Sequence, residues 1–368
     1  MEEGVLIIGL IIQFLSGAIN LYHTFKNYLV IKQYIPATTN SSATITVIVA
    51  AHNEENNLKK LVPKLLNQAY LNFKVIVVLD RCMDNSLAYL KSILDPRLMF
   101  EEVNHLPANW NGKKYALKRG IDKAKSDWIL LTDADCTPSS KNWIENMSKH
   151  ISTDIDVVLG VGIFKKSQGL LNELIQYETL ITASRYISNA LKGKPFMGVG
   201  RNLAYRKSTF LKKDGFHGFE HIVGGDDDLI VQRISTKTNT AVAFGEYSST
   251  YSEAKRTWSA YLKQKTRHLG VSKYYLMPIK WLHSIWFAAH ITFWSSFLFL
   301  VTFNLAESIS FSIFVIYITI KGLILKLTAN RLGIKWLPMW IIIVDFIYTL
   351  FFPLWTLKSV LTKKIGWN

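Results

Sequence analysis

Two aspartates follow a short apolar run in the middle of the chain. Asp133 and Asp135 end the stretch Trp128-Ile-Leu-Leu-Thr-Asp-Ala-Asp135, which we expect to be a buried strand with its carboxylates at the end. Because alternate side chains of a strand point the same way, both carboxylates should face one point. Such a pair suits Mg²⁺ or Mn²⁺ that also binds a diphosphate. Acidic strand ends are also common in solvated turns, so the surrounding motifs must decide between the two interpretations.

Polar side chains also follow two earlier apolar runs. Asn53 comes after the run that ends at Ala50, and Asp80 directly follows Val77-Val-Leu. An amide or a carboxylate at the end of a parallel strand can accept hydrogen bonds from the base or ribose of a nucleotide. Either residue can equally cap the helix that follows it, and the sequence leaves both roles open.

A Gly-Lys pair lies between these runs and the two aspartates, in Asn111-Gly-Lys-Lys-Tyr-Ala-Leu117. At the start of a helix, backbone N–H groups and the ammonium of Lys113 can hold phosphate oxygens. The GxxxxGK[ST] pattern of a P-loop is absent. The alternative is that Lys113 and Lys114 form a solvated first turn.

Three aspartates precede an apolar helical stretch in Val223-Gly-Gly-Asp-Asp-Asp-Leu229. Acidic side chains at a helix start interact favourably with the helix dipole, which is sufficient to explain one of them. Transfer of a group to a hydroxyl requires a base that takes the hydroxyl proton, and a positioned carboxylate can serve. Asp226 is the first candidate for this base and Asp227 is the alternative.

Short β-branched runs alternate with amphipathic stretches through the polar middle of the chain. The expected strands are 45–50, 74–79 and 128–132, and the expected helices are 58–69, 86–94 and 114–123. Strands separated by helix-length crossovers form a mainly parallel sheet with helices on both faces. Such sheets bind ligands at the carboxyl ends of their strands, which is where the motifs above lie. The expected fold class is therefore α/β.

Apolar segments flank this region at both ends. Residues 4–25 are long enough to span a bilayer, and the cations Lys26 and Lys32 after them favour a cytoplasmic C-terminal side. Three further apolar blocks follow Lys280, at 281–303, 309–327 and 336–357. Four residues inside the last two blocks are costly in lipid, so one block can be tilted, broken or interfacial: Lys321, Lys326, Asp345 and Pro353. A membrane protein with its polar region in the cytoplasm is expected, and the number of spans stays open.

The charge balance narrows the possible partners. The 368 residues carry a formal net charge of +16, which suits nucleic acid, an anionic membrane surface or a phosphorylated substrate. The basic stretches contain no helix-turn-helix, zinc-finger or aromatic ribonucleoprotein pattern, so nucleic acid is not an expected partner. Cys82 and Cys136 are the two cysteines, which excludes a disulfide framework, and we expect both to be reduced.

A basic, aromatic segment with helical spacing, residues 257–269, lies ahead of the C-terminal apolar blocks. Gln264 and Arg267 are three residues apart on one helix face, where they can meet a diphosphate or an acceptor. A juxtamembrane helix attracted to anionic lipid explains the same pattern.

Taken in order, these motifs resemble those of the family-2 glycosyltransferases with a GT-A catalytic domain, the group that includes cellulose and hyaluronan synthases and ceramide glucosyltransferase. The similarity spans about residues 44–273. The resemblance implies a donor site formed by Ala51, Asn53, Glu54, Asp80, Lys113, Asp133, Gln264, Arg267 and His268. It further implies a metal on Asp133 and Asp135, with Asp135 as the main ligand, and Asp226 as the base.

Two positions depart from the family pattern. Gly225 stands where the family usually has Glu, which keeps the choice between Asp226 and Asp227 open. His268 replaces a Trp often associated with polymer binding in the processive members, so a single sugar transfer is favoured over polymer extrusion. Residues 196–205 resemble the acceptor-side loop, and the expected acceptor contacts are Gly200, Arg201 and Asn202.

The resemblance implies a membrane-bound inverting glycosyltransferase. Its expected donor is a nucleotide sugar, specifically a UDP sugar, and its expected acceptor is a lipid or lipid-linked glycan. The expected organisation is a transmembrane helix and linker (1–43), a GT-A domain (44–255), interfacial helices (256–280) and a C-terminal transmembrane region (281–368). The alternatives are a nucleotidyltransferase, which would usually need a Gly-rich basic signature near the N-terminus, and a membrane scaffold with a degenerate sugar-nucleotide domain.

Overall fold

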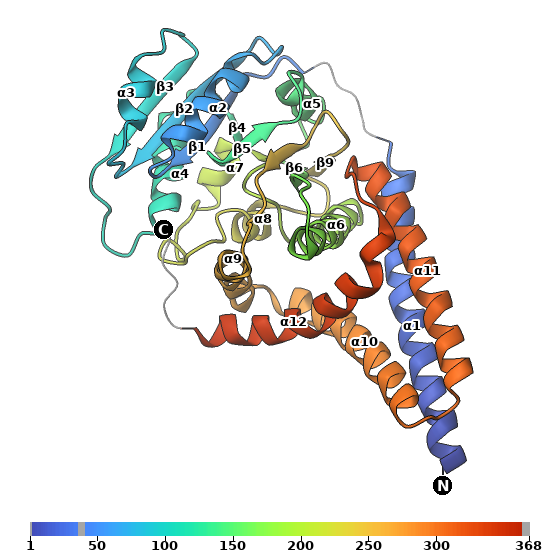
Figure 1. Cartoon of the computed structure of the whole chain (residues 1–368). Coiled ribbons are helices and arrows are strands. Elements are labelled where there is room, and N and C mark those ends of the chain that lie inside the picture. The colour runs from blue at the N-terminus through green and yellow to red at the C-terminus, as the bar shows by residue number, and fades with distance from the viewer. Residues whose placement is uncertain (1, 36–40, 363–368) are drawn as a thin grey trace. The chain divides into compact units, whose positions relative to one another are not determined.

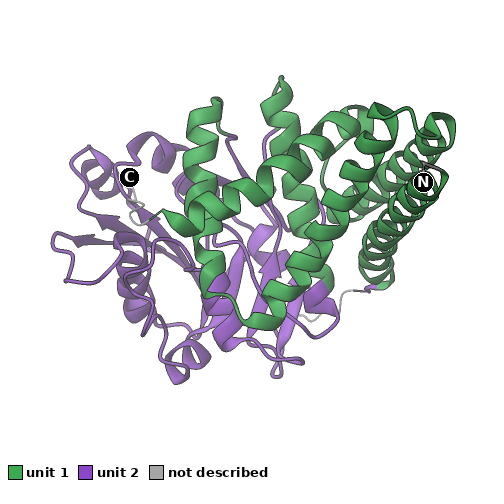
Figure 2. Ribbon diagram, turned by 90° about the horizontal axis from the view of Figure 1, so that it is seen from below, with its two compact units in different colours: residues 1–33, 166–188, 255–363 green, residues 34–165, 189–254, 364–368 purple. Residues whose placement is uncertain are grey.

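The computed structural model describes residues 2–35 and 41–362, so most of the predicted linker before residue 43 lies outside the described residues (Figure 1). The chain forms two compact units, coloured separately in Figure 2. Unit 1 comprises residues 1–33, 166–188 and 255–363, and unit 2 comprises residues 34–165, 189–254 and 364–368. Residues 166–188 fall within the predicted GT-A domain but group with the apolar helices of unit 1.

Unit 2 contains a seven-stranded sheet with the order β3-β2-β1-β4-β8-β6-β9. All of these strands except β8 are labelled in Figure 1. Its strands are β1 (Ile45–Ala51), β2 (Phe73–Asp80), β3 (Leu98–Val103), β4 (Trp128–Leu131), β6 (Val157–Gly160), β8 (Leu203–Arg206) and β9 (Thr240–Ala243). Strand β8 is antiparallel to both of its neighbours, and the other ladders of this sheet in the described chain are parallel. A second sheet has the order β5-β10-β7, with β5 (Cys136–Pro138), β7 (Gly162–Phe164) and β10 (Thr250–Ser252). The predicted α/β class with a mainly parallel sheet is confirmed.

Helices cover both faces of the larger sheet. The helices of unit 2 are α2 (Glu55–Leu66), α3 (Ser86–Lys91), α4 (Gly112–Lys123), α5 (Trp143–Ser148), α7 (Lys207–Lys212) and α8 (Asp228–Ile234). Val47 and Val49 of β1 belong to one apolar core with Leu58 and Leu61 of α2. On the other face α4 approaches so closely that a Cβ on Gly120 would lie 2.7 Å from Cγ2 of Ile48. Burial on both faces explains why the strand sequences are almost continuous apolar runs.

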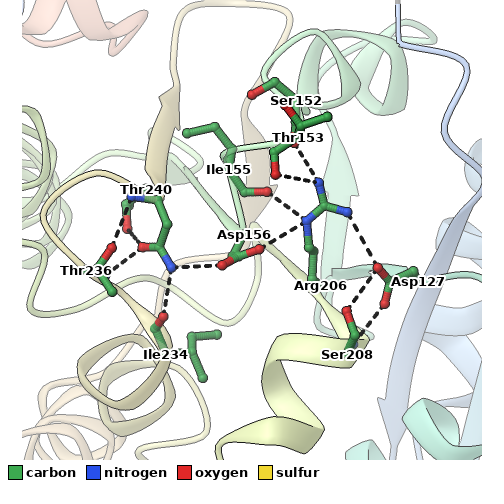
Figure 3. Close-up of polar contacts among 11 residues, drawn as sticks. Asp127, Ser152, Thr153, Ile155, Asp156, Arg206, Ser208, Ile234, Thr236 and Thr240 are labelled. Atoms are coloured by element: carbon green, nitrogen blue, oxygen red, sulfur yellow. Dashed lines mark hydrogen bonds and ion pairs between the residues drawn. The ribbon is translucent and has the colours of Figure 1, made fainter.

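Arg206 fixes the end of the antiparallel strand β8 (Figure 3). Its guanidinium donates to the carbonyl oxygens of Ile155 (2.9 Å) and Ser152 (2.6 Å) and forms an ion pair with Asp156 (3.0 Å). Asp127 lies 3.5 Å from the same guanidinium and accepts a hydrogen bond from the backbone N–H of Ser208. These contacts hold β8 beside β4, so that β8 begins at the carboxyl edge of the sheet and ends with Arg206 at the opposite edge.

Unit 1 consists mainly of long helices. They are α1 (Glu2–Gln33), α6 (Leu170–Leu191, whose last three residues belong to unit 2), α9 (Trp258–Gly270), α10 (Met277–Thr302), α11 (Glu307–Leu332) and α12 (Ile341–Leu361). The 3₁₀ helices Val271–Tyr274 and Pro338–Trp340 connect them. Within the described residues, four helical segments are long and apolar enough to cross a membrane: Glu3–Gln33, Met277–Thr302, Glu307–Leu332 and Pro338–Leu361.

Two of the charges inside the apolar helices, Lys321 and Asp345, are paired. Lys321 Nζ of α11 lies 2.5 Å from Asp345 Oδ1 of α12, and both side chains are buried. Asp345 also accepts hydrogen bonds from Tyr177 of α6 (2.5 Å) and Trp294 of α10 (3.0 Å). Because the pairing compensates for the cost of burying two charges, α11 and α12 run through these positions unbroken.

Candidate functional site

The first two strands end in loops with left-handed residues, Asn53 (φ 55°) after β1 and Arg81 (φ 49°) after β2. Ala51 is the buried last residue of β1, and Glu54 Oε2 accepts a hydrogen bond from the side chain of Asn57 (2.6 Å). Asp84 caps α2 and α3, because its carboxylate accepts from the backbone N–H groups of Glu55 (2.9 Å) and Ser86 (3.1 Å). The capping role considered for Asn53 and Asp80 therefore belongs to Asp84.

Asp80 is fully buried at the end of β2. Arg81 donates to both of its carboxylate oxygens, at 2.8 and 2.9 Å. His52 Nδ1 lies 2.5 Å from the carbonyl oxygen of Asp80, and Asn53 Oδ1 accepts from the backbone N–H of Met83 (2.8 Å). The end of β2 is thus tied to the end of β1, beside which β4 also lies.

Lys113 joins two of the predicted acidic motifs. Its Nζ lies 2.8 Å from Asp133 Oδ1 and 2.9 Å from Asp226 Oδ2. Asn111 caps α4 by accepting from the N–H of Lys114, which places Lys113 in the first turn of this helix. Burial works against the charge of Lys113, but the carboxylates of Asp133, Asp226 and Asp227 outweigh it and raise the pKa of the lysine. One permanently charged ammonium therefore lies between the candidate metal ligands and the candidate base.

Asp133 and Asp135 converge as predicted, but for a different geometric reason. Strand β4 ends at Leu131, and the two aspartates lie in a turn closed by a hydrogen bond from the N–H of Cys136 to the carbonyl of Asp133 (3.0 Å). One carboxylate oxygen of each aspartate and the sulfur of Cys136 lie within 4.8 Å of one another.

This donor set fits a hard divalent cation. The side chain of Asp135 is exposed and that of Asp133 is partly exposed, so both carboxylates are accessible to an ion that keeps open positions. Burial raises the pKa of Cys136 well above its ordinary value, and its Sγ lies 3.1 Å from Ser252 Oγ. Its thiol therefore stays protonated, and the two carboxylates are the ligands that Mg²⁺ or Mn²⁺ would prefer. Both cysteines are free, as expected.

Asp226 and Asp227 differ in their surroundings. Burial would raise the pKa of Asp226, but Lys113 and Lys114 outweigh it and lower that pKa. Burial and the neighbouring charge of Asp226 raise the pKa of Asp227. Asp227 also accepts from the backbone N–H groups of Gly200 and Asp228, both at 2.8 Å. Asp226 is thus the carboxylate that remains ionised beside Lys113, whereas Asp227 supports the backbone.

The predicted acceptor-side residues lie in the turn that leads into β8. A Cβ on Gly200 would lie 3.2 Å from Asp226 Oδ2, so this backbone passes directly beside the candidate base. Arg201 stacks over Phe164 at 4.2 Å and donates to the carbonyl of Gly162 (2.9 Å). Asn202 is fully buried: it accepts from Trp143 Nε1 (3.1 Å) and donates to the carbonyls of Val161 (2.9 Å) and Ser248 (2.8 Å). The structure therefore brings Gly200 next to Asp226 and gives Asn202 contacts that hold the fold.

The remaining predicted donor residues, Gln264, Arg267 and His268, lie on α9 in unit 1. Thr257 caps this helix, and its residues Tyr261 and Lys265 bind Glu178 of α6 at 2.8 and 2.5 Å. The contribution of Gln264, Arg267 and His268 to the donor site remains a prediction.

The sequence interpretation missed the role of Lys114. The alternative of a solvated first turn does not hold for this residue, because its side chain is fully buried. A signal was present: Lys114, Leu117 and Ile121 share one helix face by their spacing, and all three are buried.

Known proteins resemble this chain in architecture and, more weakly, in sequence. The mannosyltransferase PcManGT from Pyrobaculum calidifontis, whose structure holds GDP-Man and Mn²⁺, superposes with a TM-score of 0.59 at 16% sequence identity, covering 95% of this chain and 99% of that one. The sheet and this similarity define a GT-A fold.

The sequence comparisons identify the family. Residues 46–212 match the family described as glycosyl transferase family 2. The probable glycosyltransferase YdaM of Bacillus subtilis (strain 168) is 23% identical over 275 residues, which are 70% of this chain and 64% of that protein. Glycosyltransferase GlyG of Streptococcus pneumoniae serotype 4 (strain ATCC BAA-334 / TIGR4) is 31% identical over 124 residues, which are 32% and 39% of the two chains. The chain therefore contains a glycosyl transferase family 2 domain within residues 46–212. It spans less than two thirds of the length of either relative.

Proposed function

We propose that this glycosyltransferase transfers a single sugar from a nucleotide sugar to a lipid or lipid-linked glycan, with inversion at the anomeric carbon. The observation that carries this proposal is the position of Lys113, whose ammonium lies within 2.9 Å of both Asp133 and Asp226. The ammonium of Lys113, the candidate metal ligand Asp133 and the candidate base Asp226 therefore lie close enough to act on one substrate.

In this proposal each group has a separate task. Asp133 and Asp135 would hold Mg²⁺ or Mn²⁺, which when bound supplies positive charge that neutralises the departing nucleoside diphosphate. Lys113 binds phosphate oxygens through its ammonium. Asp226 accepts the proton of the acceptor hydroxyl as that oxygen attacks the anomeric carbon, and a single displacement inverts that centre. Ala51, Asn53, Glu54 and Asp80 form the nucleoside side of the site, and the nucleoside is proposed to be uridine.

The apolar helices support a lipid acceptor. Four segments are long and apolar enough to span a bilayer, and an enzyme anchored in this way would share the bilayer with an acceptor that is anchored there too. Unit 1 also contains an apolar hollow of about 380 Å³, its open mouth included. Aromatic residues of α9 and α12 line it, among them Trp258, Phe351, Phe352 and Trp355. Such a lining suits hydrocarbon, which supports a lipid acceptor in the cytoplasmic leaflet.

The experiment is a screen of UDP and GDP sugars with the purified protein in detergent, with and without Mn²⁺, measuring release of the nucleoside diphosphate. We expect one donor class to be consumed only with metal, and Asp135→Ala to abolish this consumption. Asp154→Ala, which removes an exposed carboxylate elsewhere in unit 2, is the matched control and should behave like the wild type. Nucleotide binding without turnover of any donor, unchanged in Asp226→Asn, would instead favour the scaffold alternative.

A further inference from the structure

A second lysine of α4, next to the one in the site, is buried and holds a different segment. Lys114 is fully buried, and its Nζ donates to the backbone carbonyls of Ile222 and Gly224, the latter at 2.5 Å. The same ammonium lies 5.7 Å from the ring centroid of Phe219. The backbone N–H of Asn111, at the start of α4, donates to the carbonyl of Glu220 (2.8 Å). The first turn of α4 therefore binds the stretch 219–224 at several points.

This stretch leads directly into the candidate base. Gly224 (φ 83°) and Gly225 (φ 74°) adopt the left-handed conformation immediately before Asp226. Glycine has more backbone freedom than any other residue, so two glycines in succession would leave the backbone before Asp226 flexible. Gly225 also stands where the resemblance leads one to expect Glu, so a side chain usual at this place is missing from the loop itself. An ammonium that binds the carbonyls of residues 222 and 224 supplies the missing restraint from outside the loop.

We propose that Lys114 is a positioning residue that fixes the segment Phe219–Asp226 and thereby sets the place of the Asp226 carboxylate. This inference rests on the proposed function for the role of Asp226, but the restraint on the segment is a property of the folded protein alone. The two adjacent lysines have different roles. Lys113 binds the carboxylate of Asp226 directly, and Lys114 binds the backbone that precedes Asp226.

The charges around Lys114 agree with this arrangement. Burial lowers the pKa of Lys114 to about 8, which Asp226, Asp227 and Glu220 partly counteract and Lys113 reinforces. Keeping a cation in such a place costs free energy unless its hydrogen bonds are satisfied. Two backbone carbonyls accept hydrogen bonds from the buried ammonium and so offset part of this cost.

Hydrogen exchange measured by mass spectrometry tests the restraint without any assumption about activity. In Lys114→Met, we expect the amides of residues 219–227 to exchange at least tenfold faster, while those of β1 and β2 keep their wild-type rates. Lys118→Met, one turn further along the same helix, where the side chain is 42% exposed, is the matched control and should leave the exchange of residues 219–227 unchanged. Unchanged exchange of residues 219–227 in Lys114→Met would overturn the proposal.

Steady-state kinetics then separates positioning from general structural damage. A small displacement of a reacting group can cost about a hundredfold in rate, so Lys114→Met should lower kcat by about 10- to 100-fold. The KM for the nucleotide sugar should stay within about threefold, because Lys113 and the metal carboxylates are intact. A rise in donor KM with kcat unchanged would contradict a positioning role. If the wild type consumes no nucleotide sugar, the proposed function fails, while the exchange result still decides whether Lys114 restrains the segment.

A measurement on the wild type covers the case in which Lys114→Met does not fold. Limited acetylation of the native protein should modify Lys118 readily and Lys114 at least tenfold more slowly, because its ammonium is buried and bonded. Equal labelling of the two lysines would show that Lys114 is not held in the folded protein and would overturn the proposal.

Discussion

Asparagine substitutions at Asp226 and Asp227 test which of the two aspartates is the catalytic base. Asp226→Asn keeps the size of the side chain but removes the group that accepts the hydroxyl proton. A positioned general base contributes about 10²- to 10⁴-fold, so kcat should fall by that factor, which is roughly 3 to 5 kcal/mol in activation free energy. Lys113 retains Asp133 as a partner at 2.8 Å, so the variant should remain folded and bind the donor.

Asp227→Asn should mainly lower the stability of the protein and have a smaller effect on kcat. Both carboxylate oxygens of Asp227 accept backbone N–H groups, from Gly200 and Asp228. Asparagine offers one oxygen, and its amide NH₂ would face the other donor. The loss of one hydrogen bond to a charged group lowers the free energy of unfolding by about 1.5 to 3 kcal/mol. We expect kcat to fall by less than about tenfold.

The assay is metal-dependent release of the nucleoside diphosphate, measured together with thermal unfolding in the same detergent. The interpretation requires that the inactive variant be Asp226→Asn and that the less stable variant be Asp227→Asn. A stable but inactive Asp227→Asn, with Asp226→Asn keeping more than about a third of the wild-type kcat, would refute the assignment of the base and transfer it to Asp227.

Three further predictions concern Gly200, Lys114 and the buried pair of Lys321 and Asp345. Gly200→Ala should lower kcat by about tenfold in steady-state kinetics, because its Cβ would lie 3.2 Å from Asp226 Oδ2, which Lys113 holds in place. Because burial lowers the pKa of Lys114 to about 8, kcat should decline above pH 8 in the wild type and not in Lys114→Met. Between about pH 8 and pH 10.5 the folded protein binds fewer protons at Lys114 than the unfolded chain does, so the contribution of this lysine to the free energy of unfolding rises with pH. Circular dichroism should therefore show that the protein stays folded while kcat declines. Lys321→Met should lower the free energy of unfolding by about 3 to 5 kcal/mol, because it leaves the buried Asp345 without its cation, and a second change of Asp345 to Leu should recover most of that loss in a thermal melt.

The parallel core of the fold could be predicted from the sequence. The expected strands 45–50, 74–79 and 128–132 correspond to β1 (Ile45–Ala51), β2 (Phe73–Asp80) and β4 (Trp128–Leu131). Strands buried on both faces have continuous apolar sequences, which made them visible. Strand β3 (Leu98–Val103) was missed, because it lies at the sheet edge and contains Glu101 and Glu102. The antiparallel placement of β8 depends on contacts such as those of Arg206 with residues about fifty positions away, which no local pattern encodes.

The site was predicted in part. The meeting of Lys113, Asp133 and Asp226 was expected from their positions at strand ends and helix starts, and the contacts are there. The turn that brings Asp133 and Asp135 together was not expected, because the alternation of a strand was extended to Asp135, whereas β4 ends at Leu131. The sequence also left the capping group of α2 undecided, because Asp84 reaches Glu55 from the end of a different strand.

The most direct test of the central claim is calorimetric titration of the purified protein with a nucleoside diphosphate, with and without Mn²⁺. If Asp133, Asp135 and Lys113 form one diphosphate site, binding should require Mn²⁺, disappear in Asp135→Ala, weaken by about 10- to 150-fold in Lys113→Met, and persist in Asp226→Asn. The weakening in Lys113→Met corresponds to the loss of one charge-assisted hydrogen bond. Binding that is indifferent to the metal and equally strong in Asp135→Ala and Lys113→Met would contradict the claim.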